Sequence, residues 1–187
     1  MNNLPKVIGI TGLKRSGKDT IGGIFVKKYN YTRLAFADPL KNIVKIMFNF
    51  NNEQLNGDLK EVEDEYWNVT PRKTMQFMGD ILRTHMNELI PDINANYFVK
   101  ILEKQMQELL KQNKSIVITD VRYPQELELI KKYNGIIIKV TNNRINTTDL
   151  HSSEQCMQQF NVNYILKNDG SINELEKNIN TMLWNFM

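Results

Sequence analysis

Two glycines and a lysine near the amino terminus constrain the fold of this chain more than any other feature. The stretch GLKRSGK at residues 12–18 has the spacing G-x-x-x-x-G-K. It follows an apolar run at 6–11 that predicts a buried strand, and it precedes a helix predicted over 19–28. Glycines let the backbone turn tightly around an anion, so that successive N–H groups and the helix dipole point at phosphate oxygens. The pattern therefore predicts a phosphate-binding loop, with Lys18 placed at the β- and γ-phosphates of a nucleotide.

The residue after this lysine departs from the usual pattern. A Ser or Thr is expected there, whereas this chain has Asp19, whose carboxylate could hold Mg²⁺ directly or through water. Lys14 and Arg15 would add positive charge beside a transferring phosphoryl group, although charged runs more often face solvent. A chance glycine turn at a helix start is the alternative to the whole assignment. The predicted cofactor-binding residues are Lys14, Arg15, Ser16, Gly17, Lys18, Asp19 and Thr20.

Strands and helices alternate along the whole chain, which predicts an α/β fold with a mostly parallel sheet. The expected strands are 6–11, 33–37, 115–119, 136–140 and 164–166. The expected helices are 19–28, 40–48, 74–88, 96–112, 124–132 and 172–184. Asp38 and Thr70 each precede a proline and are predicted to be helix N-caps, while 49–68 is predicted to mix loop and short helix. No internal repeat or domain linker divides residues 1–187, so we expect a single domain.

Composition excludes several classes of protein. The net charge of +3 is not concentrated in a basic stripe, which argues against nucleic-acid binding. No stretch approaches the roughly 20 apolar residues of a membrane span. The single cysteine, Cys156, cannot form an internal disulfide, so a reducing compartment is expected. Together with the absence of a basic leader, this predicts a cytoplasmic protein, in the host cytoplasm if its source is viral.

The phosphate-binding loop alone is shared by GTPases, motor ATPases and small-molecule kinases. A GTPase is expected to carry an Asn-Lys-x-Asp motif, and neither NNR at 142–144 nor KND at 167–169 matches it. The chain is also short for a motor ATPase. A kinase of a small molecule therefore agrees best with the sequence, by analogy at the level of the fold.

Five blocks in the same order resemble the deoxynucleoside monophosphate kinases of phages and large DNA viruses. They span roughly residues 6–182, although 49–68 is shorter than in some phage members. The blocks are KRSGKDT at 14–20, LAFADPLK at 34–41, RKTMQFMGD at 72–80, DVRYPQE at 120–126 and HSSE at 151–154.

This resemblance implies a three-layer P-loop kinase fold that uses ATP and Mg²⁺ to convert deoxynucleoside monophosphates to diphosphates. It places an acceptor-binding helical region at about 38–98 and a lid at about 142–160, and it allows a homodimer. Two alternatives stay open. One is a kinase of a non-nucleotide phosphate acceptor such as phosphomevalonate, and the other is a nucleotide-binding module without catalysis.

The acceptor site is predicted from polar residues at helix starts and strand ends. A planar guanidinium suits bidentate phosphate binding, so Arg72 is assigned to the acceptor phosphate, and the amide of Gln76 could contact a base edge. Asp120 could orient the acceptor sugar or hold Mg²⁺ through water, or simply cap a helix. The full predicted set for substrate is Asp38, Leu40, Lys41, Arg72, Gln76, Gly79, Arg83, Phe98, Asp120, Gln125 and Glu126. Phe98 could equally belong to the core, and Arg83 to the surface.

Phosphoryl transfer needs positioned cations more than a nucleophilic side chain. Arg144 in the predicted lid would approach the developing charge when the lid closes, and His151 with Glu154 could fix the closed form. Neither histidine lies in a metal-ligand pattern. The predicted catalytic residues are Lys14, Arg15, Lys18, Arg122 and Arg144.

Overall fold

The computed structural model describes residues 4–144, 157 and 160–186. The chain divides into two compact units. We call Met1–Ala35 together with Leu102–Met187 the core unit, and Phe36–Ile101 the inserted unit. Most of the predicted lid, and with it His151 and Glu154, lies outside the described residues.

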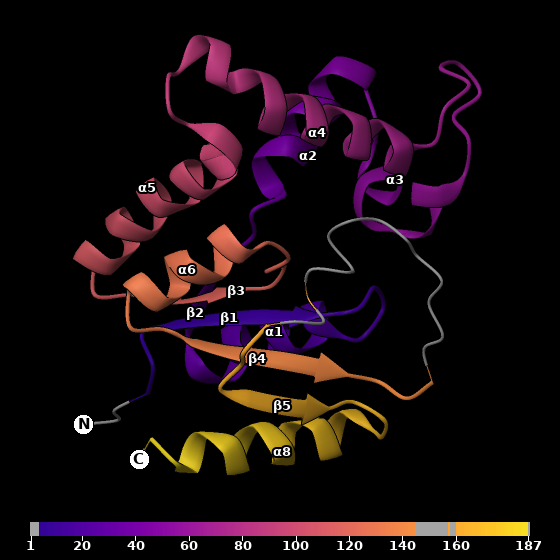
Figure 1. Cartoon of the computed structure of the whole chain (residues 1–187). Helices are drawn as coiled ribbons and strands as arrows, with labels where there is room; N and C mark the ends of the chain where they lie inside the picture. The colour runs from indigo at the N-terminus through magenta and orange to yellow at the C-terminus, as the bar shows by residue number, and fades with distance from the viewer. Residues whose placement is uncertain (1–3, 145–156, 158–159, 187) are drawn as a thin grey trace. The chain divides into compact units, whose positions relative to one another are not determined.

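The core unit contains a five-stranded sheet in which every pair of neighbouring strands is parallel (Figure 1). The strand order is β2-β3-β1-β4-β5. The strands are β1 (Val7–Gly12), β2 (Tyr31–Leu34), β3 (Ser115–Ile118), β4 (Ile136–Thr141) and β5 (Tyr164–Lys167). All five predicted strands are confirmed, although β1 lies one residue later than the predicted 6–11 and β2 begins and ends earlier than the predicted 33–37. The predicted α/β class with a parallel sheet is therefore confirmed.

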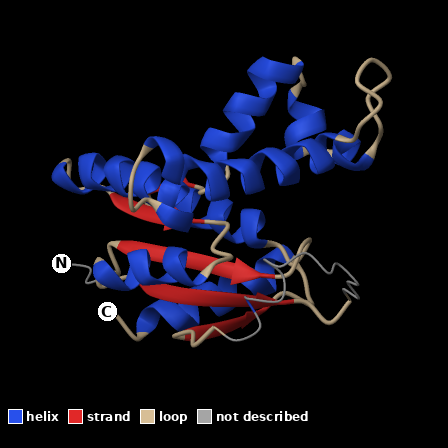
Figure 2. Cartoon of the chain, turned by 45° about the horizontal axis from the view of Figure 1, so that its top comes forward, coloured by secondary structure: helices blue, strands red, loops and turns tan. Residues whose placement is uncertain are grey.

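Helices cover both faces of this sheet and complete three layers, which Figure 2 separates by colour. Helices α1 (Lys18–Tyr29) and α8 (Ile172–Trp184) pack on one face, where Ile8, Ile10 and Phe25 belong to the same buried cluster. Helix α6 (Pro124–Lys132) and the part of α5 (Tyr97–Lys111) that belongs to the core unit lie on the other face (Figure 1). Side chains alternate along β1, because successive strand residues point to opposite faces. Within the described part of the chain, no helix is both long enough and apolar enough to span a membrane.

The inserted unit is helical and has its own small core. It contains α2 (Asp38–Phe48), α3 (Asn52–Asn56), a 3₁₀ turn (Asp58–Glu61), α4 (Pro71–Leu89), a second 3₁₀ turn (Asn94–Asn96) and the first turns of α5. The prediction of loop and short helix over 49–68 is thus confirmed. The core of this unit consists of Leu40, Val44, Phe50, Leu55, Met75 and Phe98.

The two predicted helix caps differ in outcome. The Thr70 side chain accepts a hydrogen bond from the backbone N–H of Lys73 at the start of α4, as predicted. The prediction for Asp38 is wrong, because Ala37 already has helical dihedral angles and is the N-cap of α2. Asp38 lies instead in the first turn, where its carboxylate interacts favourably with the positive end of the helix dipole.

Helix α1 packs closely against the end of β3 at Gly22. A Cβ atom added to Gly22 would lie 2.4 Å from Cγ2 of Thr119, a buried residue that follows β3. Gly23, the next residue of α1, has no such neighbour within 4 Å. The two adjacent glycines therefore differ in what an added methyl group would meet.

We predict that G22A lowers the free energy of unfolding by about 1–3 kcal/mol, because the added methyl overpacks the contact with Thr119. G23A should raise this free energy by up to about 1 kcal/mol, because alanine favours the helix more than glycine does. Urea denaturation of both variants measures the difference. Equal stabilities would show that α1 does not pack against β3 as described.

Candidate active site

The loop between β1 and α1 has the geometry that a phosphate cradle requires. Gly12 and Gly17 have φ angles of 145° and 97°, which L-residues rarely adopt. A Cβ atom on Gly12 would lie 2.5 Å from the carbonyl oxygen of Val140 in β4, so this strand end admits only glycine without movement. Gly17 is the N-cap of α1 and no side chain caps this helix. The first N–H groups of α1 are therefore left for a ligand rather than for a capping side chain.

Lys18 is held inside this loop by backbone carbonyls. Its Nζ donates to the carbonyl oxygens of Gly12 and Leu13, at 2.8 Å and 2.7 Å. The side chain is almost fully buried, with a relative exposure of 8%. A buried ammonium group needs such partners, because burial without them is very costly. The charge predicted to contact phosphate is thus already positioned against the loop.

Three buried hydroxyl groups near this loop support a polar ligand. Among the described residues, Oγ of Ser16 and Oγ1 of both Thr11 and Thr119 have no hydrogen-bond partner. An unsatisfied buried hydroxyl costs about 1–3 kcal/mol. A phosphate oxygen bound in the loop is an acceptor that could satisfy Ser16, so the residues present fit a phosphate group.

The other predicted phosphate-binding residues lie in the same loop and in the first turn of α1. Lys14 is half-buried and Arg15 is exposed, with a left-handed backbone at φ 64°. Asp19 and Thr20 are exposed in the first helical turn. A carboxylate at this end of a helix is favourable by itself, so Asp19 has a structural reason to be there in addition to any role with a metal.

The segment after β3 emerges beside the loop. The backbone N–H of Val121 donates to the carbonyl oxygen of Ile10 in β1 at 3.1 Å. Asp120 and Arg122, which flank Val121, are half-buried at this edge of the sheet. Since Tyr123 is the N-cap of α6, the alternative that Asp120 caps this helix is wrong. The carboxyl ends of parallel strands are where α/β proteins bind their ligands, which agrees with the predicted role of Asp120.

Glu126, which is in the predicted set for substrate, has backbone partners in the structure. It is buried, and its carboxylate accepts hydrogen bonds from the backbone N–H groups of Arg122 and Tyr123, at 2.7 Å and 3.1 Å. This carboxylate therefore fixes the backbone that carries Arg122. Gln125 is half-buried in the first turn of α6, and its binding of substrate stays a prediction.

The ends of β4 and β5 are joined by side chains that the sequence analysis did not identify as functional. The Asp169 carboxylate accepts from the backbone N–H of Asn143 at 2.7 Å and from its Nδ2 at 2.9 Å. Nδ2 of Asn168 donates to the carbonyl oxygen of Ser16 in the phosphate-binding loop at 2.9 Å. The motif Asn-Asp-Gly after a strand predicts only a turn, so no sequence signal pointed to these contacts. Arg144, predicted to be catalytic, is exposed just after Asn143.

Four of the predicted substrate residues form one group in the inserted unit. A Cβ atom on Gly79 would lie 3.1 Å from both Nη1 of Arg83 and Cδ2 of Leu40. Cζ of Arg83 lies 4.9 Å from the centroid of the Phe98 ring, a cation–π contact. Phe98 is only 2% exposed, so its ring belongs to the core of the inserted unit. A core role was the alternative that the sequence analysis gave for this residue. Arg83 is half-buried against this group rather than free on the surface.

Arg72 and Lys41 have partners of their own in the inserted unit. Nη1 of Arg72 lies 3.5 Å from Oε1 of Glu61, and Nζ of Lys41 donates to Oδ1 of Asn56 at 2.7 Å. Gln76, one turn after Arg72 on α4, is half-buried. The predicted phosphate-binding cations are thus held by polar groups on α3 and the 3₁₀ turn after it.

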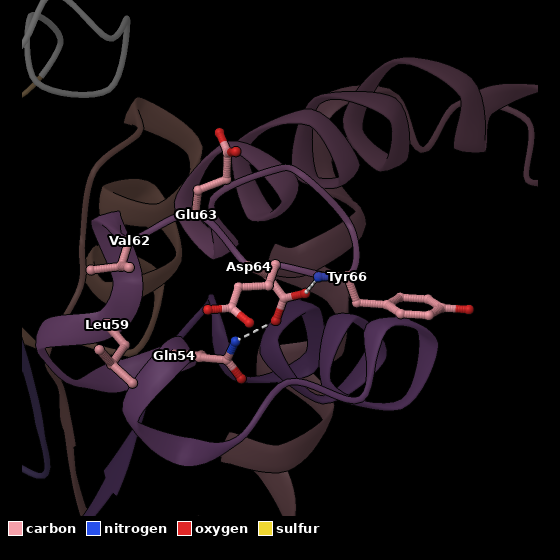
Figure 3. Close-up of a pocket in the computed structure, with 7 residues that line it drawn as sticks. Gln54, Leu59, Val62, Glu63, Asp64 and Tyr66 are labelled. Atoms are coloured by element: carbon pink, nitrogen blue, oxygen red, sulfur yellow. Dashed lines mark hydrogen bonds between the residues drawn. The ribbon is translucent and has the colours of Figure 1, made fainter.

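The inserted unit also has a pocket of about 330 Å³ that no predicted site residue lines (Figure 3). The Asp64 carboxylate at this pocket accepts hydrogen bonds from the N–H groups of Trp67 and Tyr66 and from Nε2 of Gln54. These bonds, that from Trp67 first, hold the pKa of Asp64 below its usual value. The lining residues are Gln54, Leu59, Val62, Glu63, Asp64, Glu65 and Tyr66. Because Asp64 is already bonded within its own loop, its carboxylate stabilises the turn at 64–69.

A metal site made by the protein alone is not evident in the part of the chain that is described. No group of three or more His, Cys, Asp or Glu side chains gathers there. Mg²⁺ usually takes one or two carboxylates and completes its shell with water and substrate phosphates, so such a group is not required. Of the two carboxylates predicted to hold Mg²⁺, Asp19 lies in the first turn of α1 and Asp120 lies at the carboxyl edge of the sheet.

Comparison with known proteins agrees with this geometry. The family described as deoxynucleotide monophosphate kinase matches residues 6–70 and 56–179. A protein of Acanthamoeba polyphaga mimivirus, provisionally named a deoxynucleotide monophosphate kinase, is 32% identical over 180 residues, covering 92% of this chain and 93% of its own.

Solved structures support the fold. The protein TT1252 of Thermus thermophilus superposes with a TM-score of 0.50 at 19% identity, over 98% of this chain and 99% of its own. A provisionally named kinase of Chloroflexus aurantiacus also gives a TM-score of 0.50, at 12% identity and 99% coverage of both chains. The family match over most of the chain, together with the viral relative, shows that this chain belongs to the deoxynucleotide monophosphate kinase family.

Proposed function

We propose that the protein transfers the γ-phosphoryl group of ATP to the phosphate of a deoxynucleoside monophosphate, giving ADP and the deoxynucleoside diphosphate. The observation that carries this proposal is the loop at residues 12–17, with Lys18 buried against it and the uncapped start of α1 beside it. The family match supports the identity of the acceptor.

The core unit supplies the groups that bind the ATP phosphates. The N–H groups at the start of α1 and the Ser16 hydroxyl donate to phosphate oxygens, and Lys18 exchanges its two carbonyl partners for them. Lys14, Arg15, Arg122 and Arg144 add the positive charge that the phosphoryl group needs as its bonds change. Because this charge is positioned before the reaction, little reorganisation is needed in the transition state.

The position of Asp19 leads us to include Mg²⁺ in the proposed reaction. A carboxylate next to the ATP phosphates would repel them, whereas a divalent cation held between the two removes that repulsion. When bound, Mg²⁺ would withdraw charge from the phosphate oxygens. Asp19 would hold the ion directly or through water, and Asp120 through water.

The inserted unit supplies the acceptor-binding residues. Arg72 and Lys41 bind the acceptor phosphate, and in doing so exchange Glu61 and Asn56 for phosphate oxygens. Gln76 contacts the base edge with its amide. An oxygen of the acceptor phosphate then attacks the γ-phosphorus in line, and the bond to the β–γ bridging oxygen breaks as ADP leaves. No side chain has to become a nucleophile.

The decisive experiment measures ADP release from the purified protein with ATP and Mg²⁺. The acceptors are dAMP, dGMP, dCMP, dTMP, their ribose counterparts and phosphomevalonate. Turnover with at least one deoxynucleotide is expected, and no turnover with phosphomevalonate. Binding of ATP without turnover of any nucleotide acceptor would contradict the proposal.

Loss of the Lys18 ammonium group should lower kcat/KM for ATP by about 100- to 1,000-fold, because one preorganised charge at the phosphates is removed. The variant is K18A, assayed by coupled ADP release. K28A is the matched control, since Lys28 lies in the last turn of the same helix and pairs with Glu176. Near-full activity of K18A would show that the loop does not bind the reacting phosphates.

Removal of the Arg72 guanidinium should weaken the use of the acceptor and leave the binding of ATP unchanged. We expect R72A to lower kcat/KM for the deoxynucleotide by about 10- to 100-fold, the effect of losing a charged hydrogen bond, with the KM for ATP unchanged. K73A serves as control, because Lys73 is the next residue of α4 and is exposed. An equal loss in both variants would indicate a general effect of charge rather than a specific contact.

A further inference from the structure

Asn168 links the last strand of the sheet to the phosphate-binding loop. It directly follows β5, and its backbone N–H donates to the carbonyl oxygen of Thr141 in β4 at 2.8 Å. Its side chain reaches in another direction, where Nδ2 donates to the carbonyl oxygen of Ser16 at 2.9 Å. The backbone of Asn168 is therefore held by the sheet, and its amide is free to hold the loop.

This side-chain bond determines how one peptide group of the loop is oriented. The described residues contain no cis peptide bond, and in a trans peptide the C=O and the following N–H point in opposite directions. Since Asn168 holds the C=O of Ser16, the N–H of Gly17 points to the opposite side, away from β5. Gly17 is the N-cap of α1, so this N–H is at the position where anions bind to a helix start.

The same contact explains why residue 17 has to be glycine in this chain. A Cβ atom on Gly17 would lie 2.1 Å from Nδ2 of Asn168, so the asparagine amide occupies the space of a side chain there. The amide can approach the Ser16–Gly17 peptide only because Gly17 has none. The close approach of Asn168 and the positive φ angle of 97° are thus two separate reasons for glycine at position 17.

We propose that Asn168 is a positioning residue for the reaction, which sets the Ser16–Gly17 peptide so that the loop is ready for the phosphates of ATP. This inference rests on the proposed function, in which residues 12–18 bind those phosphates. Asn168 acts through the backbone of the loop. Without its amide, the peptide can rotate, and part of the binding free energy of ATP is then used to restore it.

The chain offers a matched control at the opposite end of β5. Oδ1 of Asn163 accepts a hydrogen bond from the backbone N–H of Ile137 in β4 at 2.8 Å. Asn163 and Asn168 therefore flank the same strand, and each side chain makes one bond to backbone. Asn163 lies at the amino end of β5, whereas Asn168 lies at the carboxyl end, next to the loop.

The test compares N168A, N168D and N163A by calorimetric titration with ATP and by steady-state kinetics. N168A should raise the Kd and KM for ATP by about 5- to 10-fold, the effect of one hydrogen bond, and leave the KM for the deoxynucleotide unchanged. N168D should raise them further, because an ionised carboxylate cannot donate to the Ser16 carbonyl and would repel phosphate. N163A should bind ATP as the unaltered chain does, even if it is less stable to heat.

The results separate this inference from the proposal on which it depends. Equal ATP affinity of N168A and the unaltered chain, or an equal loss in N168A and N163A, would overturn the role of Asn168 alone. Failure of the unaltered chain to bind ATP would instead contradict the proposed function. A rise in the acceptor KM as large as that for ATP would show a general structural effect and would also overturn the inference.

Discussion

The parallel pairing of β1 with β3 on one side and β4 on the other is the constraint on which the site depends. Gly12 is opposite Val140, and Gly9 is opposite Ile118 and Ile137, so the three strands keep one register. Parallel strands place their carboxyl ends at one edge. The loops after β1, β3, β4 and β5 consequently emerge together, although they are far apart in sequence. The hydrogen bond from Nδ2 of Asn168 to the carbonyl oxygen of Ser16 joins the loop after β5 to the loop after β1.

The sequence predicted the parts of this arrangement that have local causes. The phosphate-binding loop is recognisable because glycine spacing, a preceding strand and a following helix all occur within 25 residues or so. The five strands were found for a similar reason, since short apolar runs between turn signals identify buried strands. The assignment of the Asp38 cap failed because helical backbone starts one residue earlier, a difference that propensity cannot resolve.

Contacts between distant residues could not be predicted in this way. Asn168 and Ser16 are 152 positions apart, and the asparagine stands in a motif that indicates only a turn. Glu126 was assigned to the substrate, and the structure shows that its carboxylate accepts a hydrogen bond from the backbone N–H of Arg122. Arg83 and Phe98 were predicted to bind substrate, and the structure adds that they touch each other. Sequence patterns thus predicted candidate residues, whereas the contacts of these residues depend on tertiary structure.

The place of the inserted unit in the chain has a consequence for synthesis on the ribosome. Residues 36–101 come between β2 and β3, so β1 and β2 are made long before the strand that lies between them. At about 5–20 residues per second, roughly 80 further residues take on the order of 4–16 s. During that interval the apolar β1 has neither neighbour, while the helical inserted unit has all its contacts within reach and can fold first. Exposure of β1 in the nascent chain therefore follows from the placement of a helical unit between two strands of a parallel sheet.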